Sequence, residues 1–367
     1  MPLIDALKAI AAMLVLLTHF SSYGPLAATV NEAFPAVFGW FYDYGRMAVQ
    51  VFLVIAGFLA ARGLSREGQA LTVSPLPLIW KRYLRLVVPY LAAIALAIVG
   101  AAIADQWMDD EAIPDRATLR QWLAHAFLLH GLLGFDALSA GVWYIAIDFQ
   151  LFALMAILLW SGRLRIVAPA LVLGVASLSL FWFNRDASWD NWAIYFFGSY
   201  GLGAAAWWAS ERRQMSAWLG VIATVAIAAL VVDFRLRIAL ALGVALLLGF
   251  GRRSGWLESW PNFRPLAFLG QISYSVFLVH FPVLLIANAL YTRFAPASTG
   301  AALLSLGLAW AASILAATLF YRWIESPAAS QRLTGTLGWL AGQARDGLRA
   351  APRYVVTLLR RILPGGA

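Results

Sequence analysis

Ionisable residues within an apolar run are the first feature of this 367-residue sequence that could do chemistry. The run 4–23 contains Asp5, Lys8 and His19. Lys8 and His19 are eleven residues apart, close to three helical turns, so a helix places them on one face and about 16 Å apart along its axis. Asp5 lies one turn from Lys8. The lysine can bind an anion and the imidazole can act as a general base, although a hydrogen-bonded core histidine is an equally good interpretation of this helix alone.

Two other apolar runs carry charge near their ends. Arg82 and Arg85 are three residues apart in WKRYLRLVVPY, and paired guanidinium groups can bind phosphate bidentately, while a cytoplasmic anchor is the simpler alternative. Asp148 lies in VWYIAIDFQLF, one turn from Tyr144. A buried carboxylate is protonated or paired, and the depth of Asp148 makes His19 the expected partner.

The segment LGQISYSVFLVHFPV places Ser273, Tyr274 and His280 in one helix. Ser273 and His280 are seven residues apart and therefore share a face, but no nucleophile elbow surrounds the serine, so hydrogen bonding between helices is expected. Glu325 lies in YRWIESP, where we expect an architectural salt bridge with Arg322.

Composition restricts the class of protein. Apolar residues make up 62% of the chain and charged residues 12%, about half the charged fraction of a soluble domain. The chain has no cysteine, which removes disulfides, thiolate catalysis and cysteine-bound metals. His125 and His130 are five residues apart and diverge on a helix, so they are predicted to be structural, and neither a metal nor a permanently bound cofactor is expected. The net charge of +9 is mostly arginine between apolar runs, which indicates loops facing anionic lipid rather than nucleic acid.

Ten apolar runs are long enough to cross a bilayer core about 30 Å thick. The sequence therefore predicts an all-α, polytopic membrane helix bundle within residues 1–326, a multi-pass protein of a cell membrane. The ten predicted spans are 4–23, 46–62, 84–104, 142–160, 165–183, 192–209, 215–232, 235–250, 266–290 and 301–323.

Arginine placement sets the predicted orientation. With both termini cytoplasmic, the segments after residue 141 have fourteen arginines inside and four outside. A further span at 119–134 would reverse this ratio against the positive-inside rule, so 119–134 is expected to be an outside or re-entrant helix. The basic tail 327–367 is expected to be cytoplasmic and partly an interfacial helix on anionic lipid, with a helix that binds a partner as the alternative.

Six motifs, in this order along the chain, resemble those of the membrane acyltransferase-3 family. Four positions depart from the family's usual residues: Lys8 stands for arginine, Gln50 for aspartate, Ala56 for serine and Asp148 for glutamate. The changes at Gln50 and Ala56 make the second helix less suited to catalysis. The six motifs are LIDALKAIAAMLVLLTH, GRMAVQVFLVIAGFLAARG, the pair Arg82 and Arg85, VWYIAIDFQLF, ISYSVFLVH and YRWIESP.

The resemblance implies transfer of an acyl group, usually acetyl, from cytoplasmic acyl-CoA to a hydroxyl of an extracytoplasmic or lipid-linked glycan. On this hypothesis His19 is the general base and Asp148 orients it, with an acyl-histidine intermediate as a second possibility. The CoA phosphates are expected to bind the cations at the inner mouth, Lys8, Arg82 and Arg85. Asp5, Tyr144, Ser273, Tyr274, His280 and Glu325 are expected to support the site.

A transporter or flippase is the alternative function. The same intramembrane lysine, histidine and aspartate would then relay protons or bind a substrate. Inverted repeats and unwound helix pairs favour transporters, and the sequence has neither.

Overall fold

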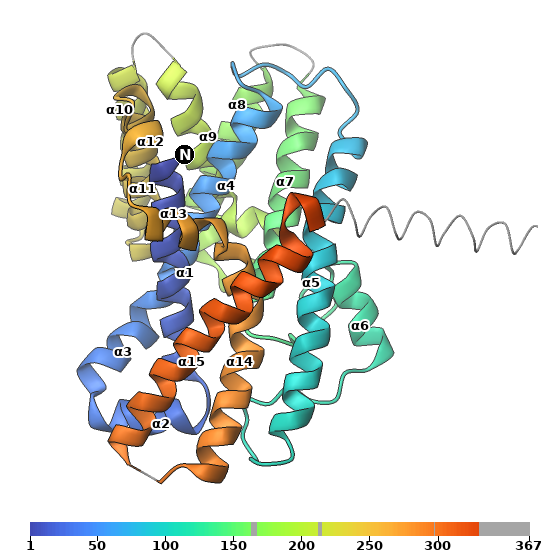
Figure 1. The fold of residues 1–367 in the computed structure, drawn as a ribbon. Helices are drawn as coiled ribbons and strands as arrows, with labels where there is room; N and C mark the ends of the chain where they lie inside the picture. Colours follow the sequence, from blue (N-terminus) through green and yellow to red (C-terminus); the bar gives the residue numbers. More distant parts are fainter. Residues whose placement is uncertain (163–166, 212–214, 297, 330–367) are drawn as a thin grey trace, which may run out of the picture. The chain divides into compact units, whose positions relative to one another are not determined.

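The computed structural model describes residues 1–162, 167–211, 215–296 and 298–329. Every regular element in this described part is helical, as predicted (Figure 1). Contacts divide the chain into two units, Met1–Leu319 and Phe320–Ala367. The first unit contains the helix bundle and every site residue discussed below, except Arg322 and Glu325. The predicted interfacial helix of the tail falls mainly on 330–367 and lies outside the described residues.

The long helices are joined by loops and by short helices. The elements are α1 (Pro2–Ser22), α2 (Gly24–Ala33), α3 (Pro35–Tyr44), η1 (Gly45–Ala48), α4 (Val49–Leu64), α5 (Leu76–Ala104), α6 (Leu119–Ala126), α7 (Trp143–Ser161), α8 (Val167–Phe181), η2 (Phe183–Arg185), η3 (Ala187–Trp189), α9 (Ala193–Glu211), α10 (Met215–Val232), α11 (Leu236–Arg253), α12 (Trp256–Ser259), α13 (Arg264–Gln271), α14 (Ser273–Phe294), α15 (Thr299–Phe320) and η4 (Tyr321–Glu325).

Seven helical segments in the described residues are long and apolar enough to cross a membrane, so the chain is a multi-pass membrane protein. The predicted count of ten spans is not confirmed. Helices α9, α10 and α11 occupy the three remaining predicted runs, but they are not among the seven, and α11 includes three arginines. The seven segments are Pro2–Ser22, Pro35–Leu64, Leu76–Ala104, Trp143–Ser161, Val167–Arg185, Ser273–Phe294 and Thr299–Glu325.

One predicted span was wrong, and two helices were not predicted. The run 266–290 is not one span, because α13 ends at Gln271 and the membrane-length helix α14 starts at Ser273. A Cβ added at Gly270 would lie 2.1 Å from the Asp5 carbonyl oxygen, so α13 crosses α1 in backbone contact just before the break. The sequence also did not predict α2 and α3, each of which begins with proline in its first turn.

The segment 119–134 forms only a short helix. Helix α6 has eight residues and rises about 12 Å, too little to cross a bilayer. A capping box explains where it starts: the Thr118 hydroxyl accepts from the Gln121 N–H, and the Gln121 side chain accepts from the Thr118 N–H. The placement of this segment on the outer side stays a prediction.

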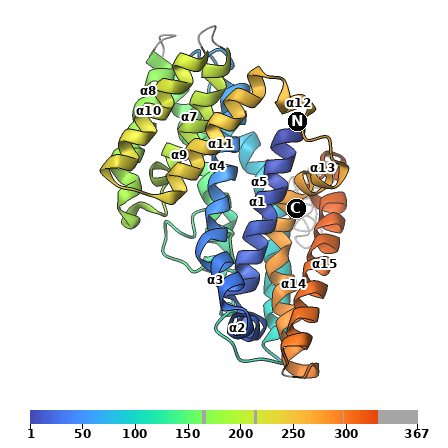
Figure 2. The same cartoon turned by 90° about the vertical axis from the view of Figure 1, so that its left-hand side faces the viewer.

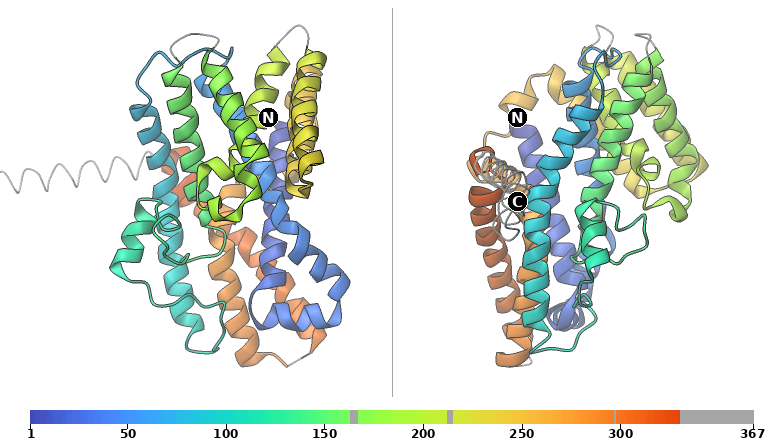
Figure 3. Two further views of the ribbon diagram at one scale, coloured as in Figure 1. Left: turned by 180° about the vertical axis from the view of Figure 1, so that it is seen from behind. Right: turned by 90° about the vertical axis from the view of Figure 1, so that its right-hand side faces the viewer.

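Helix α1 lies between α4 and α14 and contacts both (Figure 2). Helix α5 contacts α14 on one side and α7 on another, with α6 beside it (Figure 3). The most extensive contact joins α4 to α9, where glycines allow the backbones to touch. A Cβ added at Gly57 would lie 1.9 Å from the Tyr200 carbonyl oxygen, and one at Gly203 would lie 2.0 Å from that of Val54.

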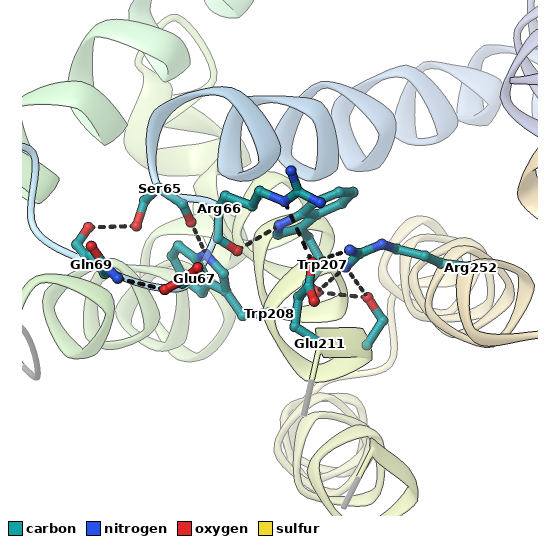
Figure 4. A network of polar contacts seen from close by, with 9 residues as sticks. Ser65, Arg66, Glu67, Gln69, Trp207, Trp208, Glu211 and Arg252 are labelled. Atoms are coloured by element: carbon teal, nitrogen blue, oxygen red, sulfur yellow. Dashed lines mark hydrogen bonds and ion pairs between the residues drawn. The ribbon is translucent and has the colours of Figure 1, made fainter. Parts of the chain in front are cut away.

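A polar network ties the loop after α4 to α9 and α11 (Figure 4). The indole N–H groups of Trp207 and Trp208 donate to the backbone carbonyls of Arg66 and Ser65 at 2.9 and 2.7 Å. The Arg252 guanidinium lies 3.5 Å above the centre of the Trp207 ring and pairs with Glu211. The network satisfies carbonyls that follow the end of α4 and fixes this end of the bundle.

Candidate active site

Two histidines from opposite ends of the sequence meet inside the bundle. His19 is near the end of α1 and His280 is two turns into α14, and the His19 Nδ1 lies 2.5 Å from the His280 Nε2. The rings are nearly parallel, with centroids 4.8 Å apart. His280 is fully buried, whereas His19 is only partly buried. The pair therefore has one member that a substrate can reach.

The hydrogen bonds determine which nitrogens carry protons. The His280 Nδ1 lies 2.8 Å from the Val276 carbonyl oxygen, which can only accept, so this nitrogen carries a hydrogen. In a neutral His280 the Nε2 is then an acceptor, and His19 donates to it from Nδ1. The Nε2 of His19 then has a lone pair, to which no described residue donates. This assignment follows from the hydrogen-bond network.

A glycine gives His19 the space it occupies. Gly141 has a φ of +81° and precedes α7 by two residues. A Cβ added there would lie 3.2 Å from the His19 Cε1 and 3.1 Å from the Phe277 Cζ. The Tyr23 ring contacts His19 edge-on at 5.5 Å between centroids. Gly141 was not among the residues predicted from the sequence, although a glycine directly before the Val-Trp of this motif is a usable signal.

The expected pairing of Asp148 with His19 is wrong. The Asp148 Oδ2 instead accepts from the Arg82 Nη2 at 2.5 Å, and the carboxylate is almost fully buried. The physical reason is the spacing along the chain. Gly141 faces His19, whereas Asp148 is seven residues further along and lies about 10 Å away by helical rise. At that level α7 contacts α5, which supplies a guanidinium.

The two arginines of α5 differ in their surroundings. Arg82 reaches Asp148 and lies 5.4 Å from the Phe152 ring centre, and its Nε is buried without a partner among the described residues. Arg85 is exposed, and the described part of the chain gives it no ion pair. The Asp148 carboxylate offsets the charge of Arg82, and the placement of both arginines at one inner mouth stays a prediction.

At the other end of α1, Lys8 and Asp5 form an ion pair, with the Lys8 Nζ 3.2 Å from the Asp5 Oδ1. Both side chains are about a quarter exposed, so the pair contributes little to stability. Lys8 and His19 lie on the same helix, as predicted. Binding of acyl-CoA by Lys8, Arg82 and Arg85 stays a prediction.

The supporting residues have mainly architectural contacts. The Ser273 hydroxyl donates to the Gly270 carbonyl at 2.9 Å, and the Tyr274 hydroxyl donates to the Leu86 carbonyl in α5 at 3.1 Å. The Tyr144 ring contacts Phe277 at 5.5 Å between centroids. Glu325 ends η4, and its expected salt bridge with Arg322 stays a prediction.

The second of the six motifs lies mainly in α4, where Gln50 makes a polar contact with another helix. Gln50 is buried in α4, and its Oε1 accepts from the Ser199 hydroxyl of α9 at 2.6 Å. The glutamine that departs from the family's aspartate therefore helps to join two helices.

The sequence of the chain is similar to those of known proteins. A family model described as an acyltransferase domain matches residues 2–322. Among curated proteins, the chain is similar to the peptidoglycan O-acetyltransferase OatA of Listeria monocytogenes serovar 1/2a (strain ATCC BAA-679 / EGD-e), with 22% identity over 369 residues. The match covers 89% of this chain and 55% of that protein, so the chain spans about half the length of this relative. No solved structure matches the chain.

Proposed function

The chain belongs to the acyltransferase-3 family, and on this premise we propose that it is a membrane O-acetyltransferase of a bacterial inner membrane. The proposed reaction moves an acetyl group from cytoplasmic acyl-CoA to a hydroxyl of an extracytoplasmic or lipid-linked glycan. The name of the relative supports an envelope glycan as acceptor, because that protein is a peptidoglycan O-acetyltransferase.

The observation that carries the proposal is the free Nε2 lone pair of His19, held by its Nδ1 hydrogen bond to His280. As general base, this nitrogen takes the proton of the acceptor hydroxyl while the oxygen attacks the thioester carbonyl carbon. The carbon–sulfur bond then breaks, and His19 returns the proton to the CoA thiolate. His280 acts as a positioning residue that fixes the tautomer and the orientation of His19.

Asp148 has a different role in this proposal from the one expected from sequence. It and Arg82 form an ion pair about 10 Å deeper than His19, on the path between the two membrane faces. We assign CoA phosphate binding to Arg85 first, because Asp148 already offsets the charge of Arg82 and Asp5 that of Lys8. A direct role of Arg82 requires that its pair with Asp148 opens.

The same lone pair also suits nucleophilic catalysis. In that alternative, the His19 Nε2 attacks the thioester carbonyl, CoA leaves, and the acceptor hydroxyl then attacks the acyl-histidine. The two routes differ in one measurable intermediate, because only the second releases CoA before the acceptor binds.

The test uses the full chain in lipid nanodiscs with radiolabelled acetyl-CoA and an oligosaccharide acceptor. We expect labelled product with the unmodified chain and a loss of about 10²-fold or more with His19→Ala. Near-normal turnover of His19→Ala would refute the proposed role of this residue. A rapid burst of CoA in the absence of acceptor would select the acyl-histidine route, and its absence would select the general-base route.

The transporter alternative is not favoured, because the family model that covers 2–322 describes an acyltransferase domain. It would regain support if the reconstituted chain consumed no acetyl-CoA but moved a solute across vesicles.

A further inference from the structure

A cavity of about 230 Å³ lies beside the first turns of α7, separate from the histidine pair. Its walls come from α7, from the segment after α6 and from the segment that leads into the first turn of α9. Small-molecule sites in proteins combine an apolar lining with a few polar groups, and this cavity has that composition. The lining includes His130, Trp143, Gln150, Asp190, Asn191 and Phe196.

One wall contains a histidine without hydrogen-bond partners. His130 is 2% exposed, and neither of its ring nitrogens bonds to any described residue. Its neighbour His125 is fully satisfied: Nδ1 bonds to the Gln121 carbonyl, and Nε2 accepts from the Leu138 N–H. The two rings stack with centroids 4.2 Å apart, so His125 holds His130 in place. A buried polar group without a partner is unusual and points to a missing ligand or water.

The loop before α9 adds exposed acceptors and donors to the lining. The side chains of Asp190 and Asn191 have no hydrogen bond within the described part of the chain and are exposed. Gln150 holds this loop, because its Oε1 accepts from the Ala193 N–H at 3.0 Å. The free carboxylate and amide therefore remain available to a ligand.

The charge of the lining selects the ligand class. Asp190 is acidic, and the lining includes no lysine or arginine among the described residues. Phosphates of CoA or of anionic lipids would be repelled. Trp143 and Phe196 add two ring surfaces with centroids 5.6 Å apart. A neutral ring that carries several hydroxyls and one apolar face matches both walls, and a sugar unit has these properties.

The cavity lies next to the histidine pair but on another face of α7. Trp143 and Gln150 are seven residues apart and share one face, whereas Tyr144 and Asp148 share a face turned well away from it. Gly141, which touches His19, precedes Trp143 by two residues, so their Cα atoms lie within about 7 Å of each other.

We propose that this cavity is a subsite for a neutral sugar unit of the acceptor glycan, next to the unit whose hydroxyl is acylated at His19. The inference rests on the proposed function and deepens it, because it makes the acceptor an oligosaccharide rather than a single sugar. Acceptors longer than one unit occupy both the reacting position and the cavity, and they bind more tightly for that reason.

The test measures binding without any acyl donor. The full chain in nanodiscs is titrated with the β-1,4-linked N-acetylglucosamine tetramer and with the monomer, and dissociation constants come from saturation-transfer NMR. We expect the tetramer to bind at least about tenfold more tightly than the monomer, as expected for one or two additional hydrogen bonds.

The variants separate the cavity from the rest of the outer surface. His130→Phe keeps the stacked ring and removes its nitrogens. Asp190→Ala removes an exposed carboxylate that makes no hydrogen bond with any described residue. Both should remove most of the advantage of the tetramer. The matched controls are Asp136→Ala and Trp192→Ala, which remove an exposed aspartate and an exposed tryptophan outside the cavity and should leave the advantage unchanged.

Each outcome has a separate meaning. Equal binding of tetramer and monomer by the unmodified chain, or tetramer binding unaffected by both cavity variants, overturns the subsite. If both cavity variants weaken tetramer binding but the unmodified chain transfers no acetyl group from acetyl-CoA, the subsite is supported and the proposed function is refuted. If the rate of acetyl transfer depends neither on acceptor length nor on either cavity variant, the subsite is refuted and the proposed function stands.

Discussion

The His19 Nδ1 lies 2.5 Å from the His280 Nε2, although 261 residues separate the two histidines. His280 is anchored in turn by the Val276 carbonyl of its own helix. This arrangement gives the C-terminal end of α1 a base whose orientation depends on a second imidazole rather than on a carboxylate.

The first prediction concerns the acceptor function of His280. His280→Ala removes the atom that accepts from His19, so we expect acetyl transfer to fall about 10- to 100-fold, within the range of general-base effects. His280→Gln places an amide oxygen in a similar position and should recover part of the rate. Turnover is measured with saturating acetyl-CoA, and equal rates for the two variants would contradict the positioning role.

A second prediction uses two glycines with similar backbone conformations. Gly141 and Gly134 both have positive φ, at +81° and +71°, but only a Cβ at Gly141 would crowd His19. Each change to alanine places a side chain in a strained region at a cost of about 1 kcal/mol or more. Only Gly141→Ala should lower acetyl transfer, with acetyl-CoA binding retained. A similar loss of activity with Gly134→Ala would mean that strain, not contact with His19, is responsible.

The buried ion pair gives a prediction about stability. Arg82→Met leaves the Asp148 carboxylate without its partner, and breaking such a pair costs about 3 kcal/mol or more, less whatever solvent screening the partly exposed arginine has. Arg85→Met removes an exposed arginine and is the control. Thermal unfolding in detergent should show a clearly lower midpoint for Arg82→Met alone. The double variant Arg82→Met with Asp148→Leu should recover much of the loss, and failure to do so would argue against a coupled pair.

Acidification should loosen the segment after α6. Burial, followed by the neighbouring His125, lowers the pKa of His130 from 6.5 to about 4. A histidine that is harder to protonate in the folded state stabilises the fold fully above pH 6.5, and this contribution is lost as the pH falls toward 4. The loss is about 2 kcal/mol at pH 5.

Hydrogen exchange of residues 127–138, corrected for the intrinsic effect of pH, reports this loosening. Exchange should be faster at pH 5 than at pH 7.5, and His130→Phe should reduce the difference. Part of the difference should persist in that variant, because burial also lowers the pKa of His125. Identical protection at both pH values would contradict the prediction.

The sequence predicted the helical class because apolar runs interrupted by arginines leave few alternatives in a bilayer. It also predicted that Lys8 and His19 share α1, since helical spacing is local information. The partner of His19 was not predictable in this way, because it depends on how α1 and α14 pack. The same applies to Asp148, whose partner is set by where α7 begins relative to α5.

Three further features of the fold were not predicted from the sequence. The prolines at the starts of α2 and α3 mark helix beginnings that a search for long apolar runs does not detect. The break at Ile272 follows the contact between Gly270 and Asp5, a tertiary event that hydropathy does not record. The cavity beside α7 combines three segments, and no single one of them has an unusual composition.

The glycine contact between α4 and α9 has a consequence for motion. With Gly57 against the Tyr200 carbonyl and Gly203 against that of Val54, the backbones of the two helices touch at two places and cannot slide past each other. They must move as one rigid body in any conformational change. Admission and release of substrates therefore require sliding or tilting at the other interfaces, such as those of α1 with α14 and of α5 with α7, where side chains separate the helices and where the histidine pair and the ion pair lie.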